Sequence, residues 1–533
     1  MNNRAAFALI ALIATPLAGQ ASRDVSGVHH TLSFDHGMPT AHVEMRVEGI
    51  DRERLEVAMP IWKPGSYRVL NFARHIESIS AVDGEGKDLS VTKTGESSWA
   101  MPTAAINTVT ISYELDMSRR GIGRQKRLEI EGRTTRQYPA YLLEGPQTWL
   151  YVPGRLDVEH RASFDLPAGW GVATGMRPTA DPKSFTCPDY DVLADCPVHM
   201  GKFEKLGFDV GGKKHEVILS GFERDDNDRE ALVERWRKIV LANVDMWGEL
   251  PYDRYVFLTG YPGGGGLEHL NSTNMTMMNL SGSREDHHSM WDSLVSHEYF
   301  HLWNVKRLRP KALGPFDYAD KEANRTRYLW VSEGITSYYG DLLCVRAGLW
   351  DPERYWTSNI TSEINSLQRN PGRLKVSVAE ASWTVWDFPY MRRGMTAPNY
   401  YNKGQLLGML LDIEIRDATN NRKSLDDVMR ELYRQCMESN SGFADGDLQK
   451  WCEEISGRSF EEFFVNHVEG TQELPFTEVL AKVGIHATPA ETSTDEDSRR
   501  RRSRGRWKLS FQKDASKRAV EIREDITRLV IPR

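Results

Sequence analysis

Two histidines and a glutamate stand at metal-binding spacing in the segment SHEYFHLWN, where His297, Glu298 and His301 form the pattern H-E-x-x-H. Residues four apart project from the same face of an α-helix, so both imidazoles can bind one ion. Zinc prefers a tetrahedral set of nitrogen and oxygen ligands, and a catalytic site needs three protein ligands and one open position. The pattern therefore predicts that His297 and His301 bind zinc and that Glu298 serves as a general base.

A third ligand must come from another segment, and the best candidate is Glu333 in YLWVSEGITSYYGDLL. Its carboxylate lies within an apolar helical pattern, where an unpaired charge would be costly. An ion pair with Arg325 or Arg327 is the alternative to metal binding. With three ligands in place, zinc would lower the pKa of a bound water toward about 7. Glu298 would accept the proton of that water and return it to a leaving amine.

The segments that must position these residues differ between the two parts of the chain. Short, alternating, β-branched stretches separated by turn formers run from residue 25 to 222 and predict an all-β, sandwich-like domain. Near Asp226 the apolar period becomes helical. The helix-rich second domain is expected to contain one strand, RYVFLTGY, and a loop region over residues 350–398. Its expected helices cover residues 287–303, 328–346, 403–416, 424–437 and 445–452.

Composition narrows the class of protein. The 533 residues carry a formal charge of -7, with basic and acidic residues mixed along the chain, so no basic face for nucleic acid is expected. Residues 1–21 have the order of a secretory signal peptide, and their apolar run is shorter than the roughly 20 residues of a membrane span. We expect an exported protein, periplasmic or secreted, without a membrane span after signal cleavage. Its expected parts are a β domain at 22–222, a catalytic domain at 223–486, and a charged linker with a short tail at 487–533.

Five cysteines fit an oxidising compartment only weakly, because a disulfide framework needs an even count. Cys187 with Cys196 and Cys436 with Cys452 are possible pairs. Cys344 lies in an apolar helical segment and is expected to be a buried thiol. A cysteine metal site is not expected, since no CxxC occurs.

The motifs together resemble the gluzincin clan of metallopeptidases, and more closely its glycyl aminopeptidase family. SHEYFHLWNVKRLRP is very similar to that family's helix motif, and PIWKPGSYRVLNFAR looks like the hallmark of its amino-terminal β domain. WVSEGITSYYGDLL resembles the W-x-x-E-G segment that supplies the third zinc ligand in the related aminopeptidase N family. The resemblance covers residues 25–485 and implies a multidomain α+β fold, in which a thermolysin-like, helix-rich zinc peptidase domain follows the β domain. Relatives commonly end in a PDZ domain, for which residues 491–533 are too few.

Two further segments gain a role from this resemblance. GGGGLEHLNS is similar to the G-x-M-E-N strand whose carboxylate binds the free ammonium of the substrate, which implies substrate binding by Glu268 with Gly265 and Gly266. YYNKGQLLGML is similar to the Y-x-K-G motif, which implies that the Tyr401 hydroxyl stabilises the oxyanion of the tetrahedral intermediate. Without this resemblance, Glu268 would be interpreted as a solvated acid after a flexible loop, and Tyr401 as an aromatic residue that packs at the start of a helix.

The leading hypothesis is a zinc-dependent aminopeptidase, with one Zn²⁺ per chain, that releases glycine or alanine from the amino termini of peptides. The preference for small residues follows from the resemblance alone. One alternative is an endopeptidase of the same chemistry, which Glu268 would disfavour if its carboxylate faced the metal. A second alternative is an inactive, zinc-stabilised peptide-binding protein. Glu298 argues against it, because a structural site needs ligands but no base.

Overall fold

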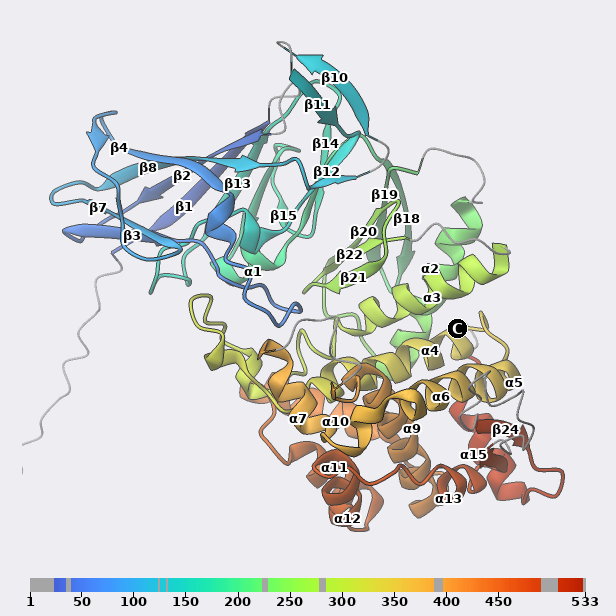
Figure 1. Cartoon of the computed structure of the whole chain (residues 1–533). Helices are drawn as coiled ribbons and strands as arrows, with labels where there is room; N and C mark the ends of the chain where they lie inside the picture. The colour runs from blue at the N-terminus through green and yellow to red at the C-terminus, as the bar shows by residue number, and fades with distance from the viewer. Residues whose placement is uncertain are drawn as a thin grey trace, which may run out of the picture.

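A computed structural model describes residues 24–34, 40–122, 125–130, 133–222, 229–277, 284–387, 396–489 and 507–530, without the side chains of 126–137 and 284–287. The expected signal peptide and most of the charged linker lie outside the described residues. Figure 1 shows a β-rich amino-terminal part and a helical carboxy-terminal part. This division confirms the multidomain α+β fold expected from the sequence.

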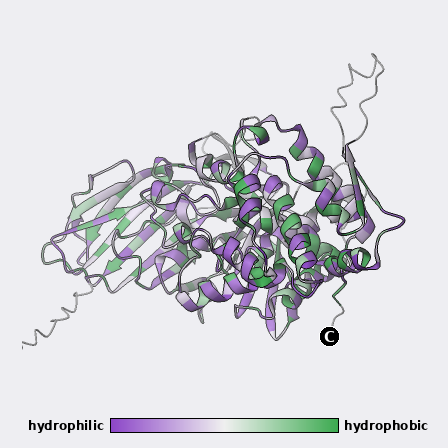
Figure 2. Ribbon diagram, turned by 90° about the horizontal axis from the view of Figure 1, so that it is seen from below, coloured by the Kyte–Doolittle hydropathy of each residue, from purple (hydrophilic) through white to green (hydrophobic). Residues whose placement is uncertain are grey.

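The amino-terminal part is built on one large sheet. Its strands alternate between buried and exposed residues, as in β2 (Thr40–Glu48), and Figure 2 shows the same alternation as hydropathy. Spatial neighbours in this sheet are β15 (Arg177–Pro178), β16 (Ser184–Cys187), β13 (His160–Asp165), β1 (Gly27–Phe34), β2, β8 (Thr108–Asp116), β4 (Ile76–Asp83) and β5 (Asp88–Leu89). One short helix, α1 (Tyr190–Asp195), interrupts the expected all-β pattern.

Smaller sheets complete this part. One consists of β3 (Arg54–Ala58), β7 (Ser98–Pro102) and β6 (Thr92–Lys93), and a second of β14 (Gly171–Thr174), β17 (Val198–Gly201), β12 (Ala140–Leu143) and β9 (Gly121–Ile122). A separate hairpin pairs β10 (Lys126–Ile130) with β11 (Arg133–Gln137). Buried residues of these sheets and of the large sheet form one hydrophobic core.

A five-stranded sheet joins the two parts. Its order is β18 (Glu204–Val210), β19 (Lys213–Ser220), β20 (Arg254–Gly260), β22 (Ser272–Thr276) and β21 (Gly265–Glu268). Since β19 pairs directly with β20, this sheet runs across the expected domain boundary at residue 222. The edge strand β21 carries Glu268 to the helical part.

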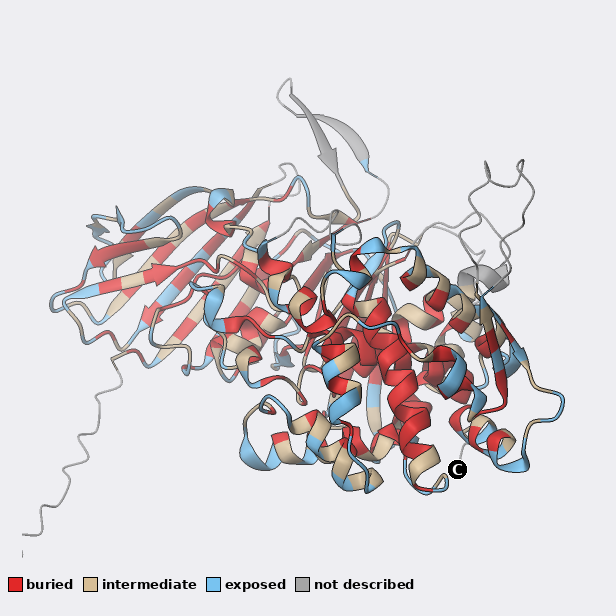
Figure 3. Cartoon of the chain, turned by 60° about the horizontal axis from the view of Figure 1, so that its bottom comes forward, coloured by how far each residue is buried: buried red, intermediate tan, exposed pale blue. Residues whose placement is uncertain are grey.

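The helices surround a buried centre, which Figure 3 shows in red. Helix α9 (Tyr400–Ala418) is buried along almost its whole length. It contacts the π-helix η5 (Trp330–Ile335), α4 (Thr336–Arg346), α10 (Leu425–Ser439), α11 (Asp447–Ser456) and α13 (Phe476–Ala481). The helical part also contains α2 (Arg229–Trp247), α3 (Arg284–Phe300), α12 (Glu461–Phe463) and the π-helix η10 (Phe464–Val468). The expected helices at 287–303, 328–346, 403–416, 424–437 and 445–452 all have counterparts here.

The expected loop region at 350–398 was wrong for residues 350–387, while residues 388–395 lie outside the described residues. The region contains α5 (Pro352–Arg354), the π-helix η6 (Tyr355–Ile360), α6 (Thr361–Arg369) and α7 (Val378–Trp383). Ile360, Ile364 and Leu367 are buried at helical spacing on one face. The tryptophans and prolines of this stretch indicated a loop, but Pro352 and Pro371 begin short helices, and Trp356 and Trp383 lie within helices.

The tail continues the helical part. Strand β24 (Trp507–Phe511) pairs with β23 (Ile485–Pro489), and Ile522 and Ile526 of α15 (Lys517–Ile526) enter the main core. All five cysteines are buried free thiols, so neither possible disulfide is formed. None of the described helices is long and apolar enough to cross a membrane.

Candidate active site

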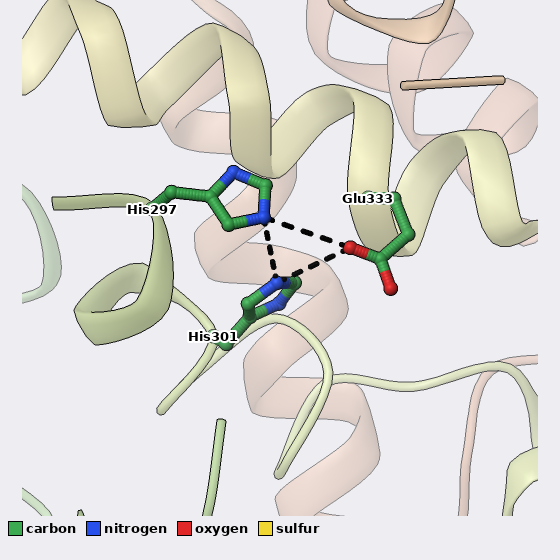
Figure 4. Close-up of side chains that lie close together, drawn as sticks. All are labelled: His297, His301 and Glu333. Atoms are coloured by element: carbon green, nitrogen blue, oxygen red, sulfur yellow. Dashed lines mark hydrogen bonds and ion pairs between the residues drawn. The ribbon is translucent and has the colours of Figure 1, made fainter. Parts of the chain in front are cut away.

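His297, His301 and Glu333 meet in space and point toward one another (Figure 4). The Nε2 atoms of the two histidines are 3.0 Å apart, and Glu333 Oε2 lies 3.3 Å from His301 Nε2 and 3.6 Å from His297 Nε2. Ligands at about 2.1 Å from a tetrahedral zinc ion would be about 3.4 Å apart. These three residues, hereafter the triad, therefore fit a zinc ion by donor type and by spacing.

Helix α3, the residue that follows it and the π-helix η5 carry the triad. His297 lies in the last turn of α3, and His301 follows directly after it. Glu333 lies in the π-helix η5, a helix type that often occurs at functional sites. A side chain at Gly334 would collide with the backbone of Gly404 in α9. The glycines after Glu333 and before the core of α9 thus let the two helices approach closely.

Hydrogen bonds to the outer nitrogens orient both imidazoles. His301 Nδ1 donates to the backbone oxygen of Asn304 at 2.8 Å, which leaves Nε2 free for a metal. His297 Nδ1 lies 3.4 Å from Ser337 Oγ, which in turn donates to the Glu333 carbonyl at 2.9 Å. Sequence reasoning left these partners open. The signal for Ser337 was its position four residues after Glu333, which puts both on one helix face.

Glu298 faces the same pocket as the triad. It is only 5% exposed, and its Oε2 has no hydrogen-bond partner in the described part of the chain. Burial raises the pKa of Glu298 well above its usual range, and the nearby charges of Glu268 and Glu333 raise it further. A side chain at Gly266 would collide with the Glu298 carboxyl group, so β21 passes directly over it.

The pocket, about 480 Å³ in volume, is strongly acidic. Its carboxylates come from Glu268, Glu298, Glu333, Asp341 and Glu363, and among the described residues that line it there is no lysine or arginine. Burial lowers the pKa of His301, but Glu268 and Glu333 outweigh that effect and raise the pKa to about 10. Without a metal, a proton on His301 thus compensates part of the negative charge. A divalent cation at the triad would do so more fully.

Glu268 is buried, with 6% exposure. The alternative interpretation of Glu268 as a solvated acid is therefore excluded. Its carboxylate, that of Glu298 and a ring nitrogen of His301 lie within 4.8 Å of one another. This second cluster could also hold a metal. The triad fits zinc better, because it combines two imidazoles with one carboxylate, as catalytic zinc sites do.

Tyr401 lines the pocket beside the triad. Its ring stacks on that of His297, with centroids 6.1 Å apart. The Asn399 side chain caps α9 by accepting the Tyr401 N–H at 3.0 Å. Burial raises the pKa of Tyr401 well above its usual range, so its hydroxyl keeps its proton and can donate it in a hydrogen bond.

The alternative partners of Glu333 are engaged elsewhere. Arg325 Nη2 lies 2.6 Å from Asp387 Oδ1, and Arg327 contacts Glu380 and Glu469. The ion pair that the sequence left open does not occur.

Sequence reasoning missed the residues that the amino-terminal part brings to this site. Gly65 lines the pocket, and the buried Tyr67 lies near the Glu333 carboxylate, whose charge adds to the effect of burial in raising the pKa of Tyr67. Asp195, at the end of α1, forms an ion pair of 2.6 Å with Lys306, contacts His269 and accepts the Leu270 N–H at 2.6 Å. No local pattern could reveal these contacts, because they join segments far apart in the sequence.

Comparisons with known proteins agree with this geometry. Residues 291–407 match the M61 glycyl aminopeptidase family, and residues 30–202 match the Peptidase M61 N-terminal domain. The chain is similar to the structure of an aminopeptidase N family protein from Idiomarina loihiensis, with 27% identity, a TM-score of 0.78, and coverage of 88% of this chain and 80% of that one. A search of curated proteins found no match.

The fold alone is also shared with an M1 zinc metallopeptidase from Deinococcus radiodurans, a Glu-to-Ala mutant bound to a Tyr-Ser-Ala substrate. The two chains are 12% identical, with a TM-score of 0.51 and coverage of 85% of this chain and 95% of that one. Fold and family matches together define a metallopeptidase. The chain belongs to the M61 glycyl aminopeptidase family, whose two matched regions span more than half of it.

Proposed function

We propose that the protein is a zinc-dependent aminopeptidase that removes small amino-terminal residues, glycine or alanine, from peptides. The observation that carries the proposal is the buried carboxylate of Glu268, which shares one pocket with the triad and Glu298. A carboxylate held there can bind the free ammonium group of a peptide at the pocket edge. The description of the family as glycyl aminopeptidases supports a preference for small amino-terminal residues.

Each functional residue of the pocket would have a separate role in the reaction. A zinc ion at the triad would polarise the scissile carbonyl and acidify a water molecule. Glu298 would take a proton from that water at its unpartnered Oε2 and return it to the leaving amine. The Tyr401 hydroxyl would donate a hydrogen bond to the oxyanion, while Glu268, with the backbone of Gly265 and Gly266, would hold the amino terminus.

The two alternatives predict different reactions. An endopeptidase would cleave amino-blocked peptides, although Glu268 would then remain buried without a cationic partner. A zinc-stabilised binding protein would cleave nothing. The buried, unpartnered Glu298 oxygen argues against that alternative, because a structural metal site gains nothing from it.

The test compares hydrolysis of alanyl and glycyl amide reporters with that of an amino-blocked peptide, for the wild type and the Glu298→Gln variant, with zinc content measured in each. We expect cleavage of the free-amine substrates only, abolished in the variant while zinc is retained. Cleavage of the blocked peptide would favour the endopeptidase, and zinc without any cleavage would favour the binding protein. Export, which the pattern of residues 1–21 supports, is tested by cellular fractionation and by sequencing the mature amino terminus.

A further inference from the structure

One loop of the amino-terminal part, residues 63–67, reaches into the helical part. Its base is anchored there, because the Ile61 N–H donates to the Tyr318 carbonyl at 3.0 Å and the Trp62 indole N–H donates to the Asp317 carbonyl at 2.7 Å. Trp62 also packs edge-on against Trp386, with ring centroids 5.2 Å apart. The loop is therefore held against the helical part.

The tip of this loop lies against the edge strand of the pocket. Gly65 has a φ of +81°, and a Cβ added to it would collide with the Leu267 side chain and lie 3.2 and 3.4 Å from the two carboxylate oxygens of Glu268. Only glycine fits here without displacing Leu267 or straining the backbone. One added carbon atom at position 65 would therefore disturb the contact between this loop and the pocket.

Tyr67, two residues further on, has an unusual backbone for a bulky residue. Its φ is 48°, a left-handed conformation that is strained for a bulky side chain and persists only where its surroundings impose it. The side chain is 3% exposed, and its ring is held edge-on by Trp386 at 6.0 Å. This strained conformation places the hydroxyl near the Glu333 carboxylate, and burial together with the negative charge of Glu333 raises the pKa of Tyr67.

We propose that Tyr67 is a positioning residue of the metal site, whose hydroxyl donates to the Glu333 carboxylate and keeps Oε2 turned toward His297 and His301. The inference rests on the proposed function, in which Glu333 is a metal ligand. It assigns to the amino-terminal domain a direct part in metal binding. Residues that hydrogen-bond a metal ligand typically change metal affinity by 10- to 100-fold when removed.

The test is the Tyr67→Phe variant, which keeps the ring against Trp386 and removes only the hydroxyl. The matched control is Tyr318→Phe, which removes a similarly buried tyrosine hydroxyl. This hydroxyl donates to the Asp191 carboxylate at 2.8 Å, and Tyr318 is not among the described residues that line the pocket. Zinc dissociation constants are measured by competition with a chromogenic chelator. Thermal midpoints of the metal-free proteins check that each variant folds.

We expect Tyr67→Phe to weaken zinc binding by about 10- to 100-fold and Tyr318→Phe to leave it unchanged. Aminopeptidase activity of Tyr67→Phe should be low at limiting zinc and recover with excess zinc, which a general loss of structure would not allow. Wild-type zinc affinity in Tyr67→Phe, or equal losses in both variants, would overturn the inference. The Glu333→Gln variant separates the two proposals: if it too binds zinc like the wild type, the proposed metal site itself is wrong.

Discussion

Replacing Asp195 should lower both the stability of the protein and its affinity for substrate. The Asp195 side chain is 11% exposed, and that of its partner Lys306 is 9% exposed. The Asp195→Asn variant keeps the shape of the side chain but leaves the Lys306 ammonium buried without a counter-ion. Breaking a buried ion pair in this way costs about 3–5 kcal/mol. His269 and Leu270, which Asp195 also holds, follow Glu268 directly, so substrate affinity should fall as well.

The assay is thermal unfolding, with KM measured for an alanyl reporter. At about 1–2 °C per kcal/mol for a chain of this size, the midpoint should fall by roughly 3–10 °C. Asp253→Asn is the matched control, because Asp253 pairs with Lys213 while 99% exposed, and such pairs contribute about 0–1 kcal/mol. The double variant Asp195→Asn with Lys306→Met should recover part of the loss, since no buried charge remains.

The effect should also depend on pH. Burial alone would raise the pKa of Asp195, but Lys306 and His269 hold it well below its usual range. A carboxyl group with a lowered pKa in the folded state stabilises the protein fully above its unfolded pKa of about 3.9, and this contribution is lost as the pH falls further. The difference between wild type and Asp195→Asn should therefore be greatest near neutral pH and shrink in acid. A difference in midpoint no larger than that of Asp253→Asn would refute the reasoning.

Four further predictions concern the pocket and its supports. Tyr401→Phe should lower kcat by about 10²–10³-fold with little change in KM, measured by steady-state kinetics. Burial raises the pKa of Asp341 to about 6, so the wild type should lose up to about 3 kcal/mol of stability as the pH rises from 4 to 6; Asp341→Asn should show a flatter profile of thermal midpoint against pH. Zinc at about 100 times its dissociation constant should stabilise the metal-free protein by about 2.7 kcal/mol, and a chelator should reverse the shift. Gly334→Ala should destabilise the fold by about 1–3 kcal/mol, because the new methyl group meets the backbone of Gly404; an unchanged denaturation midpoint would contradict this.

Several features of this protein could be predicted from the sequence because they depend on short-range geometry. The spacing of His297 and His301 puts both on one side of a helix wherever that helix lies. Alternation in the strands and helical periods after residue 226 likewise predicted the order of the β and helical parts. Glu333 could be chosen as their partner because a lone charge in an apolar helix needs one. The structure brings these three residues together.

Sequence patterns gave a wrong prediction where the residue composition indicated a loop but the spacing of the apolar residues was helical. Residues 350–398 were expected to form a loop, because tryptophan and proline obscured the helical spacing of Ile360, Ile364 and Leu367. The π-helical turn that carries Glu333 was also not predicted. This turn packs closely against α9 at Gly334 and Gly404, which are 70 positions apart.

The sequence by itself determined the chemistry of this protein: which residue types could bind a metal, act as a base or hold an amino terminus, and on which elements they lie. Only the tertiary structure decided which distant segments complete the pocket. Tyr67 reaches Glu333, Gly65 covers Glu268 and Asp195 holds the segment that follows it. The reason is physical, because helix and strand periods act over a few residues, whereas these contacts depend on how one domain packs against another.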